Sequence, residues 1–223
     1  MNITKSYDFF KPETCHDPIH IIGCGAIGST LAENLVRYGL SNIVLYDFDS
    51  VEAHNVANQM FTEEDIGKPK VQALADMLVR INPQVKNTLR LVPQGYRAQR
   101  LSGYVFLCVD NIDLRREIAE RFQHNPYVKG MFDFRMRLTD AQHYAADWSD
   151  PKMVRDFISS MQFTHEEAKE ETPVSACNLT LSVCSTVRLI VSVGVSNFIN
   201  FVKGSGIKKL ILADAFRYDV QAF

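Results

Sequence analysis

The sequence predicts an α/β protein with a Rossmann-like three-layer fold, in which a mainly parallel central sheet continues into antiparallel strands in the C-terminal part. Three observations predict this class. An apolar run at residues 20–22 leads into a glycine-rich turn and a helix-forming stretch that stops at Gly39. A second apolar run at 42–46 ends at Asp47, which completes a βαβ unit and starts a parallel sheet. Residues 104–109 are apolar throughout, as expected for a strand buried on both faces.

The other elements of the first two thirds follow in order. Residues 1–17 are polar and mixed and should form an irregular arm, and 51–64 should be irregular as well. Helices are expected over 68–81, where apolar residues share one face, over 113–122 and, for a short stretch, over 151–161. Strands are expected over 88–92, 128–137 and 140–146.

The last third is expected to hold one long helix between a loop and two strands. Residues 165–173 are acidic and lack an apolar period, so 162–176 should be a solvent-exposed crossover loop. Apolar residues then recur at helical spacing from Val183 to Phe201; β-branching argues for a strand, but the length favours a helix. Gly204 and Gly206 should end it, and strands over 207–213 and 216–220 should follow. Because no linker or repeat interrupts the chain, we expect residues 1–223 to form a single domain.

Composition narrows the function classes. The net charge of −2 gives no reason to expect general nucleic-acid binding. The apolar stretch 183–202 contains Arg188, Asn197 and Asn200, which favours a buried helix over a membrane span. The N-terminus does not resemble a signal peptide. The cysteine count of 5 is odd and includes no CxxC pair, which predicts free thiols in a cytoplasmic protein without a tetrahedral zinc site.

The glycine-rich turn reads GxGxxG. Gly23 would allow the tight turn, Gly25 would let the backbone approach a phosphate, and Gly28 would let the helix pack against the strand. Asp47, 19 residues past Gly28, could accept hydrogen bonds from ribose hydroxyls. The positions expected to contact phosphate are Gly23, Gly25, Ala26, Ile27 and Gly28. These features fit NAD, FAD or ATP equally well.

Motifs further along the chain distinguish between these nucleotides. They are Asp47-x-Asp49-x-Val51-Glu52-x-x-Asn55-x-x-x-Gln59, Asp65-Ile66-Gly67-Lys68-x-Lys70 and Asp110-Asn111-x-Asp113-x-Arg115. The set resembles the ThiF / molybdopterin-synthase-activating / ubiquitin-activating superfamily, with its glycine loop, DxDxVExxNxxRQ, DxGxxK and strand-terminal DN. The resemblance is strong over residues 19–120 and weak over 131–202. It identifies the chain as a short member of this superfamily without the CxxC zinc pairs, forming one adenylation domain.

The resemblance implies an adenylyltransferase that uses ATP and Mg²⁺ to convert a carboxylate into an acyl-adenylate with release of pyrophosphate. It implies a ubiquitin-like protein, a sulfur-carrier protein or a peptide as substrate. Some relatives act on a modified tRNA base, which the near-neutral charge disfavours. The roles it implies are ribose binding by Asp47, phosphate orientation by Asn55 and Gln59, phosphate binding by Lys70, Mg²⁺ binding through ATP by Asp110 beside Asn111, and a second metal or water contact by Asp49.

One position departs from the family pattern. The arginine that usually precedes the glutamine is Asn58 here, and asparagine carries no charge. Another arginine could supply the charge, with Arg115, Arg135 and Arg137 as candidates, or a second subunit could do so in a homodimer, as the resemblance implies. The chain could also be a non-catalytic module that binds nucleotide or a partner. A NAD-dependent oxidoreductase remains an alternative on the glycine loop and Asp47 alone.

The cysteines raise the question of a covalent step, since some relatives pass the activated carboxylate to a cysteine. Cys177 is the best candidate, because it should lie at the start of the long helix, where the helix dipole lowers a thiol pKa. The simpler interpretation, which we favour, is that Cys177 and Cys184 are buried packing residues. Cys108 is expected in the core of a strand, and Cys24 is expected to fill the glycine loop.

Overall fold

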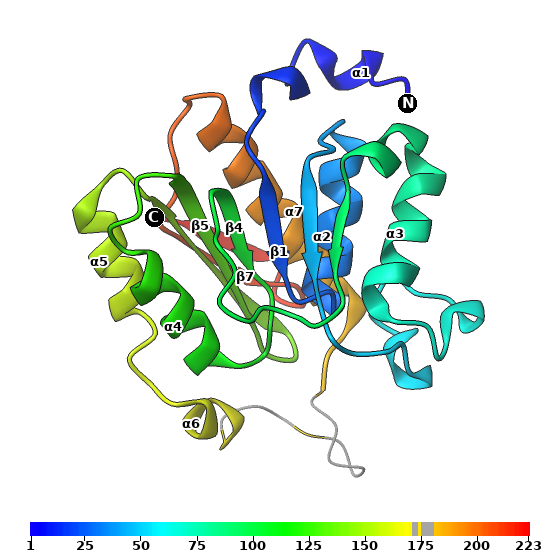
Figure 1. The fold of residues 1–223 in the computed structure, drawn as a ribbon. Coiled ribbons are helices and arrows are strands. Elements are labelled where there is room, and N and C mark those ends of the chain that lie inside the picture. Colours follow the sequence, from blue (N-terminus) through cyan, green and yellow to red (C-terminus); the bar gives the residue numbers. More distant parts are fainter. Residues whose placement is uncertain (171–173, 175–180) are drawn as a thin grey trace.

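The computed structural model describes residues 1–170, 174 and 181–223, and these build one sheet of 8 strands with helices on both faces (Figure 1). The strand order is β3-β2-β1-β4-β5-β6-β7-β8. Strands β1 to β5 pair in parallel, and β6, β7 and β8 add to the far edge in antiparallel fashion. The strands are β1 Ile19–Ile22, β2 Ile43–Tyr46, β3 Arg90–Val92, β4 Gly103–Leu107, β5 Val128–Met136, β6 Asp140–Asp147, β7 Leu210–Asp214 and β8 Asp219–Ala222. The predicted fold class is therefore confirmed.

The ends of the first four strands lie at one level. Ile22 at the end of β1 pairs with Tyr46 in β2 and with Leu107 in β4, and Tyr46 pairs with Val92 in β3. The strand order reverses between β1 and β4, and loops leaving such a reversal point diverge and open a crevice. The loops after β1, β2, β3 and β4 consequently meet along a single edge of the sheet.

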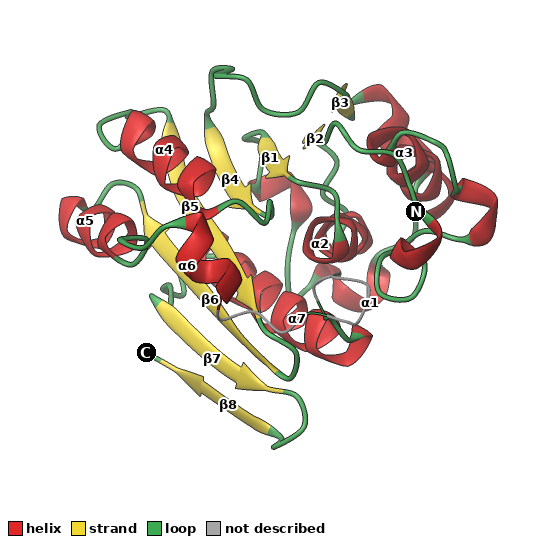
Figure 2. Ribbon diagram, turned by 90° about the horizontal axis from the view of Figure 1, so that it is seen from below, coloured by secondary structure: helices red, strands yellow, loops and turns green. Residues whose placement is uncertain are grey.

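Helices cover the sheet on both sides, which gives three layers (Figure 2). The helices α2 Ala26–Arg37, α3 Lys70–Ile81 and α7 Cys184–Val202 share one core cluster, and α4 Ile112–Phe122 and α5 Pro151–Ser159 share the other. Under α7, the rings of Phe106 and Phe132 stack at 4.7 Å between centroids, and Phe198 meets the Phe106 ring edge-on at 5.2 Å. Gly194 lets α7 lie close to the sheet, because a Cβ at this position would lie 2.4 Å from the ring of Phe134 in β5.

Helix α7 is long and apolar enough to cross a membrane by length and composition, with a mean hydropathy of 1.4 over its most apolar window. Half of that window is buried inside the molecule, where α7 packs beside α2 and over β5, β6 and β7. Thr186 and Asn197 are buried polar residues of α7 that bond the backbone carbonyls of Leu138 and Lys208. The apolar composition of this helix is accounted for by its place in the core.

Several predicted boundaries were wrong. The arm expected to be irregular contains a short helix, α1 Thr4–Tyr7, and a 3₁₀ turn at Pro12–Thr14. The crossover loop expected over 162–176 begins with a helix, α6 His165–Glu170, whose exposed acidic face gives no apolar period to detect. The predicted final strands were placed too early, because residues 216–218 form the turn between β7 and β8. Further 3₁₀ turns lie at Ala53–Asn55, Glu63–Asp65 and Pro83–Asn87.

Candidate nucleotide site

The glycine loop is tightly constrained at two of its glycines and open at the third. Gly23 has a φ of +100°, and a Cβ there would lie 2.7 Å from the backbone of Cys108. A Cβ on Gly28 would lie only 1.9 Å from the carbonyl oxygen of Gly23, so α2 can pack this closely only with glycine at that position. A Cβ on Gly25 would meet nothing within 4 Å. The loop therefore leaves space beside Gly25, at the N-terminus of α2, where an anion is favoured.

Asp47 joins the end of β2 to this loop. Its Oδ2 accepts the backbone N–H of Cys24 at 2.6 Å, and its Oδ1 accepts that of Asp49 at 2.9 Å. Burial raises the pKa of Asp47, and the two backbone N–H groups oppose that rise. Because a carboxylate has about four acceptor sites, Asp47 can hold the loop and still accept ribose hydroxyls.

The segment after β2 carries Asn55 and Gln59, and the structure gives them different surroundings. Asn55 is buried, and its Oδ1 accepts the backbone N–H of Glu52 at 2.9 Å, which caps the 3₁₀ turn. The Oε1 of Gln59 is buried and has no hydrogen-bond partner among the described residues. A buried oxygen without a donor is costly, and a bound molecule with donor groups would satisfy it.

Lys70 is the first residue of α3 and is bound to Asp49. Its Nζ lies 2.9 Å from Asp49 Oδ2, and its backbone N–H donates to the carbonyl oxygen of Asp49, also at 2.9 Å. The Lys70 side chain is 9% exposed, whereas that of Asp49 is 51% exposed. Helix α3 begins at Lys70 and not at Lys68, because Pro69 occupies the N-cap position.

Asp110 and Asn111 follow β4 on the other side of the strand-order reversal. Asn111 is the N-cap of α4, accepting the N–H of Leu114 at 3.0 Å, and Asp110 is exposed. Asp110 therefore does not cap the helix. It lines a cavity of about 640 Å³, together with Ile112, Arg115, Arg135, Met136, Arg137, Asp140, Gln142, Tyr144, Ser160, Phe163, Glu167, Ala168 and Glu170.

Arg115 and Arg135, the candidates for the missing charge, are engaged in contacts of their own. Arg115 donates to Asp133 at 2.7 Å and to the carbonyl oxygen of Phe134 at 2.6 Å. Arg135 donates to the other oxygen of Asp133 at 2.7 Å and lies over the ring of Tyr144 at 4.1 Å. Two guanidinium groups thus stabilise one fully buried carboxylate. Arg137 lines the cavity and is bound as well.

The cysteine predictions have mixed outcomes. Cys177 lies outside the described residues, and α7 begins at Cys184. Cys184 is exposed, which contradicts the expected buried packing role. Cys24 is buried as expected, whereas β4 ends before Cys108, which is partly buried. Burial raises the pKa of both of these thiols.

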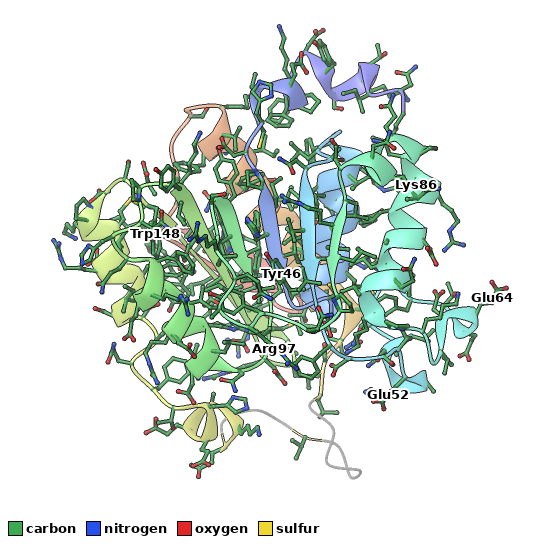
Figure 3. The ribbon with its side chains drawn as sticks, viewed as in Figure 1. Tyr46, Glu52, Glu64, Lys86, Arg97 and Trp148 are labelled. Carbon is green, nitrogen blue, oxygen red and sulfur yellow. The ribbon has the colours of Figure 1, made fainter. Side chains whose placement is uncertain are left out.

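The predicted residues gather along one edge of the sheet. In Figure 3, Tyr46 marks the end of β2, and Glu52 and Arg97 lie below it, on the segments that follow β2 and β3. Trp148 and Lys86 lie on opposite flanks, away from this edge. Among the described parts of the chain, no group of three or more histidine, cysteine or acidic side chains is placed to bind a metal ion.

Sequence reasoning missed two features of this edge. Phe48, between the two aspartates, is 77% exposed and packs against Gly95 of the loop after β3. Arg188 of α7 reaches the segment after β2, where its Nη1 lies 2.6 Å from Met60 Sδ. A single arginine in an otherwise apolar helix indicates that Arg188 has a special role. The sequence pattern alone does not show towards which segment its side chain points.

The fold and this edge define a protein of the Rossmann-like α/β class, and comparisons with known proteins identify its family. A model of the ThiF family matches residues 16–221. Ubiquitin-like modifier-activating enzyme 5 of Drosophila willistoni is 32% identical over 134 residues, which cover 53% of this chain and 32% of that protein. The same enzyme of Drosophila mojavensis is 31% identical over 141 residues, covering 56% and 34%. This chain belongs to the ThiF family, and its match spans about a third of the length of these curated relatives.

Solved structures show the same fold. E. coli MccB, crystallised with MccA-N7isoASN, superposes with a TM-score of 0.73 at 13% identity, covering 95% of this chain and 66% of that one. MccB with ATP gives a TM-score of 0.67 at 15% identity, covering 95% and 64%. PaaA gives 0.68 at 14% identity, covering 99% and 68%.

Proposed function

We propose that the chain is an ATP-dependent adenylyltransferase that activates a carboxylate. The observation that carries the proposal is the convergence, along one sheet edge, of an open glycine loop, Asp47, Lys70 and Asp110. These groups come from β1, β2, α3 and the loop after β4, on both sides of the strand-order reversal. The unpaired Oε1 of Gln59 beside them supports a site that accepts a ligand.

Each of these groups binds a different part of ATP. Asp47 accepts the ribose hydroxyls, the N–H groups at the start of α2 bind phosphate oxygens, and Lys70 supplies a positive charge. Asp110 would hold Mg²⁺ together with ATP, and the ion would supply positive charge to the phosphate oxygens. An oxygen of the substrate carboxylate then attacks the α-phosphorus, the bond to the bridging oxygen breaks, and pyrophosphate leaves with the electron pair. The products are an acyl-adenylate and pyrophosphate.

The proposed substrate is the C-terminal carboxylate of a ubiquitin-like protein, a sulfur-carrier protein or a peptide. Two similarities support it: the matched relatives are ubiquitin-like modifier-activating enzymes, and MccB was crystallised with MccA. The cavity lined in part by Asp110 offers about 640 Å³, enough for the last residues of an extended chain. We further propose a homodimer, which rests on the resemblance to the superfamily.

Binding of Mg-ATP is the first test. At about 100 times its dissociation constant a ligand adds roughly 2.7 kcal/mol of stability. Thermal unfolding of the wild type should shift upward with Mg-ATP and not with NADH, and Lys70→Ala should reduce the shift. Lys68→Ala is the matched control, because Lys68 pairs with Asp65 at 2.9 Å and its side chain is 44% exposed. A shift with NADH alone would identify an oxidoreductase.

A non-catalytic nucleotide-binding module is the second candidate. It is favoured by Asn58 and by the engagement of Arg115 and Arg135 with Asp133. Exchange of labelled pyrophosphate into ATP, measured with and without a candidate carboxylate partner, separates the two. Exchange that requires the partner and is lost in Lys70→Ala excludes the module, and ATP binding without any exchange supports it.

A further inference from the structure

Arg188 has an environment that its structural role does not explain. It lies one turn into α7, and its side chain is partly buried. Within the described residues, its one polar contact is with the thioether sulfur of Met60. A thioether is a weak acceptor, whereas a guanidinium carries five donors and prefers carboxylate or phosphate oxygens. The cation is thus held in place without a matching anion.

The contact with Met60 places Arg188 close to the glycine loop. The backbone N–H of Met60 donates to Ser29 Oγ at 3.2 Å, and Ser29 directly follows Gly28 in the first turn of α2. Two contacts therefore connect the Arg188 head group to the helix N-terminus. Helices α2 and α7 pack side by side, and α7 starts at the edge where β1 and β4 end (Figure 1).

A second, independent observation points to a ligand that carries hydrogen-bond donors, such as the hydroxyl or amino groups of a nucleotide, at this place. Gln59 precedes Met60, and its Oε1 is buried without a partner among the described residues. The space beside Gly25 is open on the neighbouring loop. A buried oxygen without a partner among the described residues, an under-used guanidinium and an open helix N-terminus thus lie on segments that contact one another.

Four other cations near this edge are paired with carboxylates, whereas the exposed Arg97, on the loop after β3, donates to the carbonyl oxygen of Gln94. Lys68 binds Asp65, and Arg115 and Arg135 bind Asp133, while Lys70 binds Asp49. A bound triphosphate carries several negative charges, and its leaving pyrophosphate gains more as the bond breaks. The site therefore needs a cation that is not neutralised by a neighbouring carboxylate, and Arg188 meets that need.

We propose that Arg188 binds the β- and γ-phosphates of ATP and supplies the positive charge that Asn58 does not carry. The inference rests on the proposed adenylyltransferase function and assigns a phosphate-binding residue to it. The guanidinium exchanges the Met60 sulfur for phosphate oxygens, a charge-assisted contact that also stabilises the departing pyrophosphate. Because AMP lacks the two outer phosphates, Arg188 should distinguish ATP from AMP.

Calorimetric titration with Mg-ATP and with AMP tests this, using the wild type, Arg188→Ala and the control Arg155→Ala. Arg155 is an exposed arginine of α5, on the opposite face of the sheet. Arg188→Ala should weaken Mg-ATP binding by about 10- to 100-fold and leave AMP binding within about twofold, since contacts to charged groups have this strength. Arg155→Ala should change neither. Thermal unfolding without ligand checks that each variant is folded.

A charge-relocation variant distinguishes phosphate binding from a packing role. Placing the guanidinium on the segment after β2, with Asn58→Arg in the Arg188→Ala background, should recover part of the affinity for Mg-ATP. Equal Mg-ATP affinity in Arg188→Ala and wild type, or equal losses for ATP and AMP, would overturn the assignment while the proposed function stands. A wild type that fails to bind Mg-ATP would overturn both.

Discussion

The pairing of Arg115 with Asp133 predicts that Arg115 stabilises the fold and does not serve as a ligand for phosphate. Asp133 is fully buried, and its two oxygens accept Arg115 and Arg135 at 2.7 Å each. Arg115→Met would leave Asp133 with Arg135 alone and remove the donor to the carbonyl oxygen of Phe134. Breaking a buried pair costs about 3–5 kcal/mol, and the surviving Arg135 contact places the expected loss near the lower value, about 3 kcal/mol.

Urea unfolding followed by circular dichroism at neutral pH measures this loss by linear extrapolation. For a protein of this size, about 3 kcal/mol corresponds to a fall in Tm of roughly 6–12 °C. Adding Asp133→Asn to Arg115→Met removes the stranded charge, so the double variant should be more stable than Arg115→Met alone. If Arg115→Met stays within about 1 kcal/mol of the wild type and instead loses affinity for Mg-ATP, the structural assignment is wrong.

Three further outcomes are expected. Gly25→Ala should keep the stability of the wild type and lose nucleotide affinity. Gly28→Ala should lower the free energy of unfolding by about 1–3 kcal/mol or more, because its Cβ would lie 1.9 Å from a carbonyl oxygen. Chemical denaturation and ATP titration of both variants measure the difference. Burial lowers the pKa of His143 to about 4, below its unfolded pKa of about 6.5. The free energy of unfolding should therefore be unaffected above pH 6.5 and fall by up to about 3 kcal/mol as the pH drops towards 4. Unfolding curves of His143→Gln measured across this range should show a weaker pH dependence. In a Cys177→Ser background, Ellman's reagent should modify Cys184 quickly and reach Cys24 only on unfolding; fast reaction at Cys24 would contradict its burial.

The fold class could be predicted because its signals are local. The glycine turn, the apolar runs and Asp47 each lie within a short window, and the sheet order follows from the usual βαβ connections. Boundaries failed where a local pattern was missing. The helix His165–Glu170 has no buried residue, so no apolar stripe could reveal it. The turn at 216–218 depends on Asp214 accepting the N–H groups of Phe216 and Arg217, a contact that the apolar pattern of these residues does not indicate.

The sequence motifs predicted which residues belong to the candidate site, but they could not predict the contacts that these residues make. The motifs named Asp47, Asn55 and Lys70, and the structure brings their segments to one edge. They could not show that the side-chain oxygen of Asn55 accepts the backbone N–H of Glu52, because that hydrogen bond depends on the turn geometry. Nor could they show that α7 carries Arg188 to Met60, a pairing across 128 positions of the chain. Long-range pairings of this kind follow from packing, which sequence spacing does not encode.

The pair of Lys70 and Asp49 is compatible with a phosphate ligand because of its uneven exposure. Asp49 has a side chain that is 51% exposed, so water can solvate its carboxylate when the lysine turns away, whereas Lys70 at 9% exposure needs a partner anion. Pairs that are exposed on one side contribute only about 0–1 kcal/mol, so exchanging Asp49 for a phosphate oxygen costs little. Asp133 is fully buried, and releasing Arg115 from it would leave a carboxylate that water cannot reach. Burial therefore gives the two ion pairs different roles. A ligand can open the pair of Lys70 and Asp49, whereas the pair of Arg115 and Asp133 holds α4 against the sheet.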